Sequence, residues 1–185
     1  DSLEIMRDNN ILGRIFHSDY HTKPLRMLCK LQDEIGQVRL APRLLAVSGF
    51  DDAHYTGLDS IMTMPNRYKR SGKAILEALQ TLEVISPYNY RVVIYRYGHD
   101  VATDALMVKA AHYGATGGDV VQMINDHTNW HAPTLPINGD DLQELGVQPG
   151  PKLGEIRKQV EDWWLARDFT PDHRECRDYA RFLVN

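Results

Sequence analysis

Residues 146–154 read Gly-Val-Gln-Pro-Gly-Pro-Lys-Leu-Gly, and this stretch decides the fold of the C-terminal part of the chain. Gly146 and Gly150 tolerate a backbone with positive φ, and Pro151 suits the first position of a helix. The stretch therefore predicts a tight hairpin between two helices. We expect a short helix before it, over residues 140–145, and a longer one after it, over residues 152–167.

The same hairpin has the chemistry of an anion site. The first amides of a helix have no partner within the helix, and the helix dipole favours a negative charge beside them. Lys152 lies next to the turn and adds a positive charge. The pattern predicts a helix–hairpin–helix unit that holds a nucleic-acid phosphate at Gly146, Gly150 and Lys152. An ordinary helical hairpin, in which glycine and proline only end helices, fits the spacing equally well.

Helical patterns continue on both sides of this unit. After it, Leu153, Ile156, Val160, Trp163 and Trp164 form one apolar stripe, and Thr170-Pro171 opens a final helix that runs through Phe182. Before it, two prolines in four residues, Pro133 and Pro136, disfavour helix and mark a subdomain boundary.

The N-terminal part also predicts helices. Ile75, Leu76, Leu79 and Leu82 recur at helical spacing. Ser86-Pro87 is typical of a helix start, so the apolar run over residues 91–95 is interpreted as helix. Further helices are expected over residues 25–32, 40–47, 101–112 and 119–130, with Gly98 and Gly114 at helix ends. The sequence therefore predicts an all-α protein, a multi-helix array of about eight to ten helices.

Composition narrows the class of protein. Of the 185 residues, 43% are hydrophobic and 25% charged, which is typical of a globular domain, and no apolar run is long enough to span a membrane. The only cysteines, Cys29 and Cys176, are too few for a disulfide framework, which favours a reducing, cytoplasmic setting. Because the chain does not begin with Met, we expect it to be part of a longer protein.

One basic stretch lies in this acidic chain. The net charge is −4, but residues 66–97 carry six basic and two acidic side chains, and five tyrosines lie among them. Basic side chains neutralise phosphates, and tyrosine rings stack on unpaired bases. The stretch therefore predicts nucleic-acid contact, although a solvated helix face is also compatible with it. The six basic residues are Arg67, Lys69, Arg70, Lys73, Arg91 and Arg96.

A search for catalytic motifs gives no catalytic residue and no metal ligand. His99-Asp100 matches the dipeptide of metal-dependent phosphohydrolases, but nothing selects the further ligands that such a site needs. His127 and His131 have the four-residue spacing of a helical metal pair, without a third ligand. Residues 117–119, Gly-Gly-Asp, match part of a nucleotidyl-transfer signature. The Asp-x-Asp pair that would hold Mg²⁺ does not follow them.

Three blocks together resemble one family. Residues 135–142 and 146–156 closely resemble the tail of bacterial tRNA nucleotidyltransferases, the CCA-adding enzymes that are grouped with the bacterial poly(A) polymerases. Residues 90–106, with an apolar-Tyr-Arg-x-Gly run, look like the body helices of that family. Residues 3–12 resemble the end of its neck, with Asn9-Asn10 where Asn-Gly is usual.

The resemblance implies the all-helical C-terminal region of such an enzyme: the neck end at 1–20, the body at 21–134 and the tail at 135–185. In the family, body and tail grip tRNA so that its 3′ end reaches a catalytic head, where Mg²⁺ acts with CTP or ATP. The head's motifs have no match here, and Asp178-x-x-Arg181 fits only half of one at the wrong end of the chain. We therefore expect no cofactor in this chain, no activity on its own, and tRNA or another RNA 3′ end as partner.

Two other classes remain open from the sequence. The hairpin alone would fit a helix–hairpin–helix DNA-binding module of a repair protein. His99-Asp100 alone would fit a phosphohydrolase. The sequence does not distinguish CCA addition from A addition or poly(A) synthesis, because the resemblance assigns that choice to the head.

Overall fold

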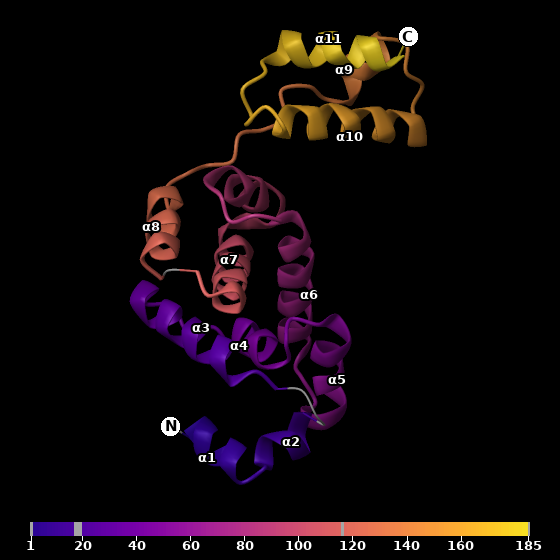
Figure 1. Cartoon of the computed structure of the whole chain (residues 1–185). Coiled ribbons are helices and arrows are strands. Elements are labelled where there is room, and N and C mark those ends of the chain that lie inside the picture. Colours follow the sequence, from indigo (N-terminus) through magenta and orange to yellow (C-terminus); the bar gives the residue numbers. More distant parts are fainter. Residues whose placement is uncertain (1, 17–19, 116, 185) are drawn as a thin grey trace. The chain divides into compact units, whose positions relative to one another are not determined.

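A computed structural model describes residues 2–16, 20–115 and 117–184, and over these residues it contains eleven helices and no strand (Figure 1). This confirms the all-α prediction. The described residues include no helix that is both long and apolar enough to cross a membrane. The chain divides into two compact units, residues 1–130 and residues 131–185.

The described residues of the first unit form eight helices. Four of them, α3, α4, α6 and α7, surround a shared core in which Leu28, Leu45, Ile75 and Leu106 are fully buried. The apolar residues of α3 and α6 recur every three or four positions, and this spacing places them on one face of each helix. The eight helices are α1 (Ser2–Asp8), α2 (Ile11–Phe16), α3 (Thr22–Ile35), α4 (Leu40–Val47), α5 (Asp52–Met62), α6 (Asn66–Thr81), α7 (Pro87–Tyr113) and α8 (Gly117–His127).

Helix α7 is interrupted at Gly98, as the sequence predicts. Gly98 has φ 81° and ψ 166°, which is not helical, so α7 consists of two helical segments. The first segment begins at the predicted cap, where the Ser86 side chain accepts a hydrogen bond from the Asn89 amide and Pro87 follows. The second ends at Gly114, which is left-handed with φ 70°. The apolar run over residues 91–95 is helical, which confirms that interpretation.

The second unit contains α9 (Gly139–Glu144), α10 (Pro151–Leu165) and α11 (His173–Val184), which pack on one another (Figure 1). Its core is formed by Leu142, Ile156, Val160 and Trp164, with Cys176 from α11. The Trp164 indole donates to the Pro171 carbonyl (3.1 Å), so the loop before α11 is fixed to α10. A capping box of Asn138 and Asp141 starts α9.

Candidate nucleic-acid interface

The first two turns of α6 carry four of the six predicted basic residues. Pro65 precedes the helix, and Arg67, Arg70 and Lys73 follow at three-residue intervals, which places them near one face. All three side chains are exposed, whereas Lys69 is half-buried. The first two turns of α6 therefore form a positively charged surface of the first unit.

Two of these cations already have partners. The Lys69 ammonium lies 2.6 Å from the Asp59 carboxylate of α5, and this hydrogen bond lowers the pKa of Asp59. The Arg67 guanidinium lies over the Tyr68 ring, 4.6 Å from its centroid, and donates to the Tyr68 hydroxyl. Within the described residues, Arg70 and Lys73 have no such partner, so both are available to an external anion.

The other two predicted cations lie on the first segment of α7. Arg91 is half-buried, and its Nη1 donates to Nε2 of His127 (3.4 Å). The opposite nitrogen of His127 donates to the Met123 carbonyl (2.8 Å), so this histidine belongs to the interior of the unit. Arg96 is exposed. Arg91 therefore packs against α8, while Arg96 lies at the surface.

The hairpin of the second unit has three amides that donate to nothing within the described residues: those of Gln148, Gly150 and Lys152. The Gly146 amide is used internally, because it donates to the Gln143 carbonyl (2.8 Å). The contribution of Gly146 is therefore its backbone shape, with φ 93°. Gly150 has φ 145° and ψ −167°, a conformation that is essentially restricted to glycine.

Aromatic rings form a stack on the second unit that the sequence analysis does not predict. Trp163 of α10 and Tyr179 of α11 are nearly parallel, with centroids 4.5 Å apart, and Tyr179 stacks in turn on Phe182. The Arg167 guanidinium also lies over the Trp163 ring, 4.2 Å from its centroid. The sequence places both tryptophans in one apolar stripe, but only Trp164 is buried, and Trp163 is half-exposed.

A basic cleft of about 420 Å³ lies against α3 in the first unit. Arg7, Lys23, Arg26 and Lys30 line it, and Arg26 is paired with Glu4. The sequence does not reveal this cleft, because its cations are spread over more than twenty positions of an acidic segment. Only the helical fold brings them to one place.

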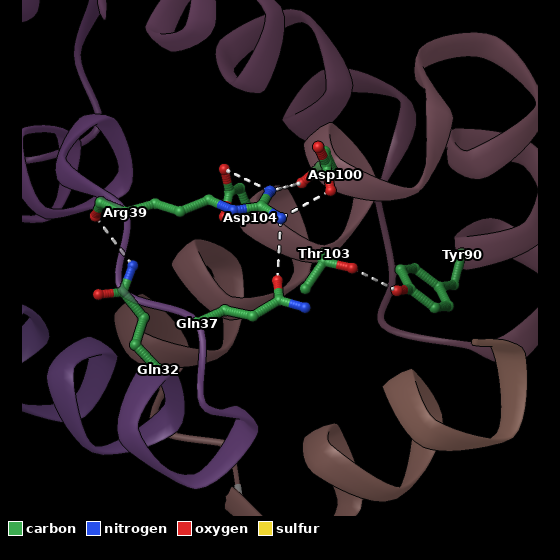
Figure 2. Close-up of polar contacts among 7 residues, drawn as sticks. All are labelled: Gln32, Gln37, Arg39, Tyr90, Asp100, Thr103 and Asp104. Atoms are coloured by element: carbon green, nitrogen blue, oxygen red, sulfur yellow. Dashed lines mark hydrogen bonds and ion pairs between the residues drawn. The ribbon is translucent and has the colours of Figure 1, made fainter.

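A polar cluster ties the α3–α4 connection to α7 (Figure 2). Arg39 lies between two acids of α7: its Nη2 is 2.6 Å from Asp100 and its Nη1 is 3.4 Å from Asp104. Gln37 accepts a further hydrogen bond from Arg39 (2.9 Å). Asp104 is buried, with one carboxylate oxygen unpartnered, and burial raises its pKa to about 6.

These contacts explain the His99-Asp100 dipeptide structurally. The Nε2–H of His99 donates to the Trp130 carbonyl (2.8 Å), and Asp100 pairs with Arg39. The predicted helical pair His127 and His131 does not form, because α8 ends at His127. The described residues include no group of three His, Cys, Asp or Glu side chains that could hold a metal ion.

Comparisons with known proteins point to one kind of enzyme. No family model matches the chain. It is 20% identical over 112 residues to the mitochondrial CCA tRNA nucleotidyltransferase 1 of Mus musculus, a match that covers 60% of this chain and 24% of the mouse protein. The Homo sapiens protein of the same name is 20% identical over 59 residues, which are 32% of this chain and 14% of the human one. The chain thus spans less than a quarter of the length of these relatives.

The chain is distantly related to the CCA tRNA nucleotidyltransferases. That part of the family prediction is confirmed. The bacterial branch, the poly(A) polymerase grouping and the neck, body and tail assignments stay predictions. A cytoplasmic location also stays a prediction, and the names of both relatives place those proteins in mitochondria.

Proposed function

We propose that this chain is the RNA-holding helical region of a tRNA nucleotidyltransferase-related protein, and that it positions a tRNA 3′ end for a catalytic domain outside these 185 residues. The observation that carries the proposal is the pair Arg70 and Lys73 at the start of α6. Both are exposed, and within the described part of the chain neither has an acidic partner. Phosphate contacts of this kind supply sequence-independent affinity.

The hairpin supports the same role. Its three free amides and the exposed Lys152 can receive one more phosphate without any base-specific contact. The partner is therefore proposed to be tRNA or a similar RNA 3′ end. Phe182 ends the aromatic stack and is exposed, so its ring adds a surface on which an unpaired base can stack.

The test is tRNA binding by the double variant Arg70→Ala/Lys73→Ala. We expect its affinity to fall by about tenfold or more, and the slope of log K against log salt to become shallower by roughly one unit per lost phosphate contact. The matched control is Arg157→Ala/Lys158→Ala, which removes two exposed cations from α10 and leaves the same net charge.

Equal affinity and equal salt slope in wild type and the Arg70/Lys73 variant would contradict the proposal. A competition series distinguishes RNA binding from the remaining alternative, a DNA-binding module. If duplex DNA displaces labelled tRNA at equal concentration, the chain is a DNA-binding module. If tRNA competes at least tenfold better, the RNA assignment holds.

A further inference from the structure

A cleft of about 430 Å³ lies between α5 and α6, on the face that presents Arg70 and Lys73. This volume lies within the range of about 300–1,000 Å³ that small-ligand sites occupy. Tyr55 and Met64 line its inner part and Thr56 of α5 its wall, while the long stems of the α6 cations add apolar surface. The cleft thus combines an apolar interior with a charged edge.

The shape of this cleft depends on one close approach. Tyr55 is 1% exposed, and its hydroxyl donates to the Tyr68 carbonyl of α6 (2.6 Å). Its ring lies directly on Gly72, where an added Cβ would be 2.1 Å from the ring atoms. Tyr55 therefore holds α5 against α6 and fixes the inner end of the cleft.

The charges around the cleft leave a net positive edge. Lys69 neutralises Asp59, which also accepts a hydrogen bond from the Met64 amide (2.8 Å). The remaining charged residues of the lining are Asp52, which is exposed at the start of α5, and Arg70 and Lys73 of α6. Two cations against one carboxylate favour an anionic ligand, and the apolar interior favours a flat ring attached to it.

We propose that this cleft binds one unpaired nucleotide, with its base between α5 and α6 and its phosphate at Arg70 and Lys73. This rests on the proposed function insofar as the nucleotide belongs to the bound RNA. It adds that the α6 surface captures a single base out of the stack, rather than only lying along a phosphate backbone. The energetic gain comes from burying the base in an apolar cleft and pairing its phosphate with two cations.

The first test uses small probes on the whole chain, so it does not depend on tRNA binding. Titrations followed by NMR amide shifts compare 5′-AMP, adenosine and inorganic phosphate. We expect AMP to bind about tenfold tighter than either adenosine or phosphate, with shifts concentrated in α5 and the first turns of α6. Phosphate binding as tightly as AMP would overturn the proposal, because the cleft would then be an anion site alone.

The second test fills the cleft without removing a charge. Thr56→Tyr places a ring in it, and the matched control Ala53→Tyr places the same ring on α5 at an exposed position outside the lining. We expect Thr56→Tyr to weaken AMP binding by about tenfold or more, while phosphate binding and the melting temperature stay as in the control. Equal AMP affinity in both variants would overturn the proposal.

Failure of the nucleotide cleft and failure of the proposed function give different results. If wild type binds tRNA and Arg70→Ala/Lys73→Ala weakens it, but Thr56→Tyr binds tRNA and AMP like the control, the proposed function stands and the nucleotide cleft is rejected. If wild type does not bind tRNA but binds AMP in a Thr56→Tyr-sensitive way, the cleft stands and the RNA-holding function is rejected.

Discussion

At the scale of single residues, Asp104 is a buried carboxylic acid of the first unit whose hydrogen bonding is incomplete. It lies in α7 at 3% exposure, and its partner Arg39 reaches only one of its two oxygens. Transfer of a carboxylate out of water disfavours the charged form, and the attraction of Arg39 offsets this only in part. The pKa is therefore raised from 3.8 to about 6.

Because the pKa of Asp104 is higher in the folded state than in the unfolded state, this group makes the stability of the protein depend on pH. Between about pH 4 and pH 6 the folded state binds more protons at Asp104 than the unfolded state does, so the free energy of unfolding from this group falls as pH rises through that window. Over the whole titration, the difference between a pKa of 3.8 and a pKa of about 6 corresponds to on the order of 3 kcal/mol. Acidification from pH 7 to pH 4.5 therefore raises the contribution of Asp104 to the free energy of unfolding, because the buried carboxylate becomes protonated.

The variant Asp104→Asn tests this directly. It removes the titrating group and keeps its shape, so its stability relative to wild type should fall by on the order of 2 kcal/mol between pH 7 and pH 4.5. Urea unfolding at four pH values measures it. Titrating acids shared by both proteins cancel in the difference. Parallel pH profiles would show that Asp104 is ionised throughout this range in the folded protein.

At the scale of elements, local patterns predicted the helices that have clear caps and one apolar face. The Ser86 cap, the break at Gly98 and the end at Gly114 all lie where the sequence places them. Helix α5 was not predicted, because its run of Asp, His, Thr and Gly residues has low helix propensity. It forms because Asp51 caps it and because Tyr55 and Leu58 are buried against the core.

The candidate site was less predictable than the helices. The basic residues of α6 were visible as a charge run, but not which of them are neutralised. Lys69 is paired with an acid ten positions earlier, and Arg91 with a histidine on α8, and these contacts depend on tertiary packing. The cleft between α5 and α6 and the cleft against α3 likewise require helices that no local pattern brings together.

The hairpin between α9 and α10 allows a sharp test of backbone against side chain. In Gly150→Val, the added Cβ has no atom within 4 Å to collide with, so the cost is backbone strain of about 1–3 kcal/mol at φ 145°. If the free amides hold a phosphate, the altered backbone should reduce tRNA affinity by more than this loss of stability explains. Lys152→Ala should reduce affinity less, because it leaves the amides in place.

Melting curves and tRNA binding of Gly150→Val and Lys152→Ala decide whether the hairpin binds phosphate. The measured binding is corrected to the folded fraction of each variant. A hairpin that serves only to join two helices predicts the opposite order. Gly150→Val would then lower the melting temperature, and the molecules that stay folded would bind tRNA like wild type. Lys152→Ala would change neither quantity.

At the scale of the whole molecule, the two units have separate cores and separate chemistry. The first contains the α6 cations and their cleft, and the second contains the free amides of the hairpin and the aromatic stack. Each provides positively charged or stacking surface. Neither provides, among its described residues, three metal-ligating side chains in one place. Under the proposed function, each unit contributes its own contacts to the RNA.

The corresponding prediction is that this 185-residue chain binds tRNA but adds no nucleotide to it. Nucleotidyl transfer needs carboxylates that hold Mg²⁺ at the α-phosphate of the incoming nucleotide. The assay incubates the chain with tRNA that lacks its 3′ CCA, radiolabelled CTP or ATP, and Mg²⁺, and follows label on the tRNA in a gel. A complete CCA-adding enzyme serves as positive control on the same tRNA. Incorporation by the chain that survives repurification would contradict the prediction, because it would require a metal-dependent centre within these residues. Binding without incorporation is the expected result, and addition of a separate catalytic domain should then restore nucleotide addition to the bound tRNA.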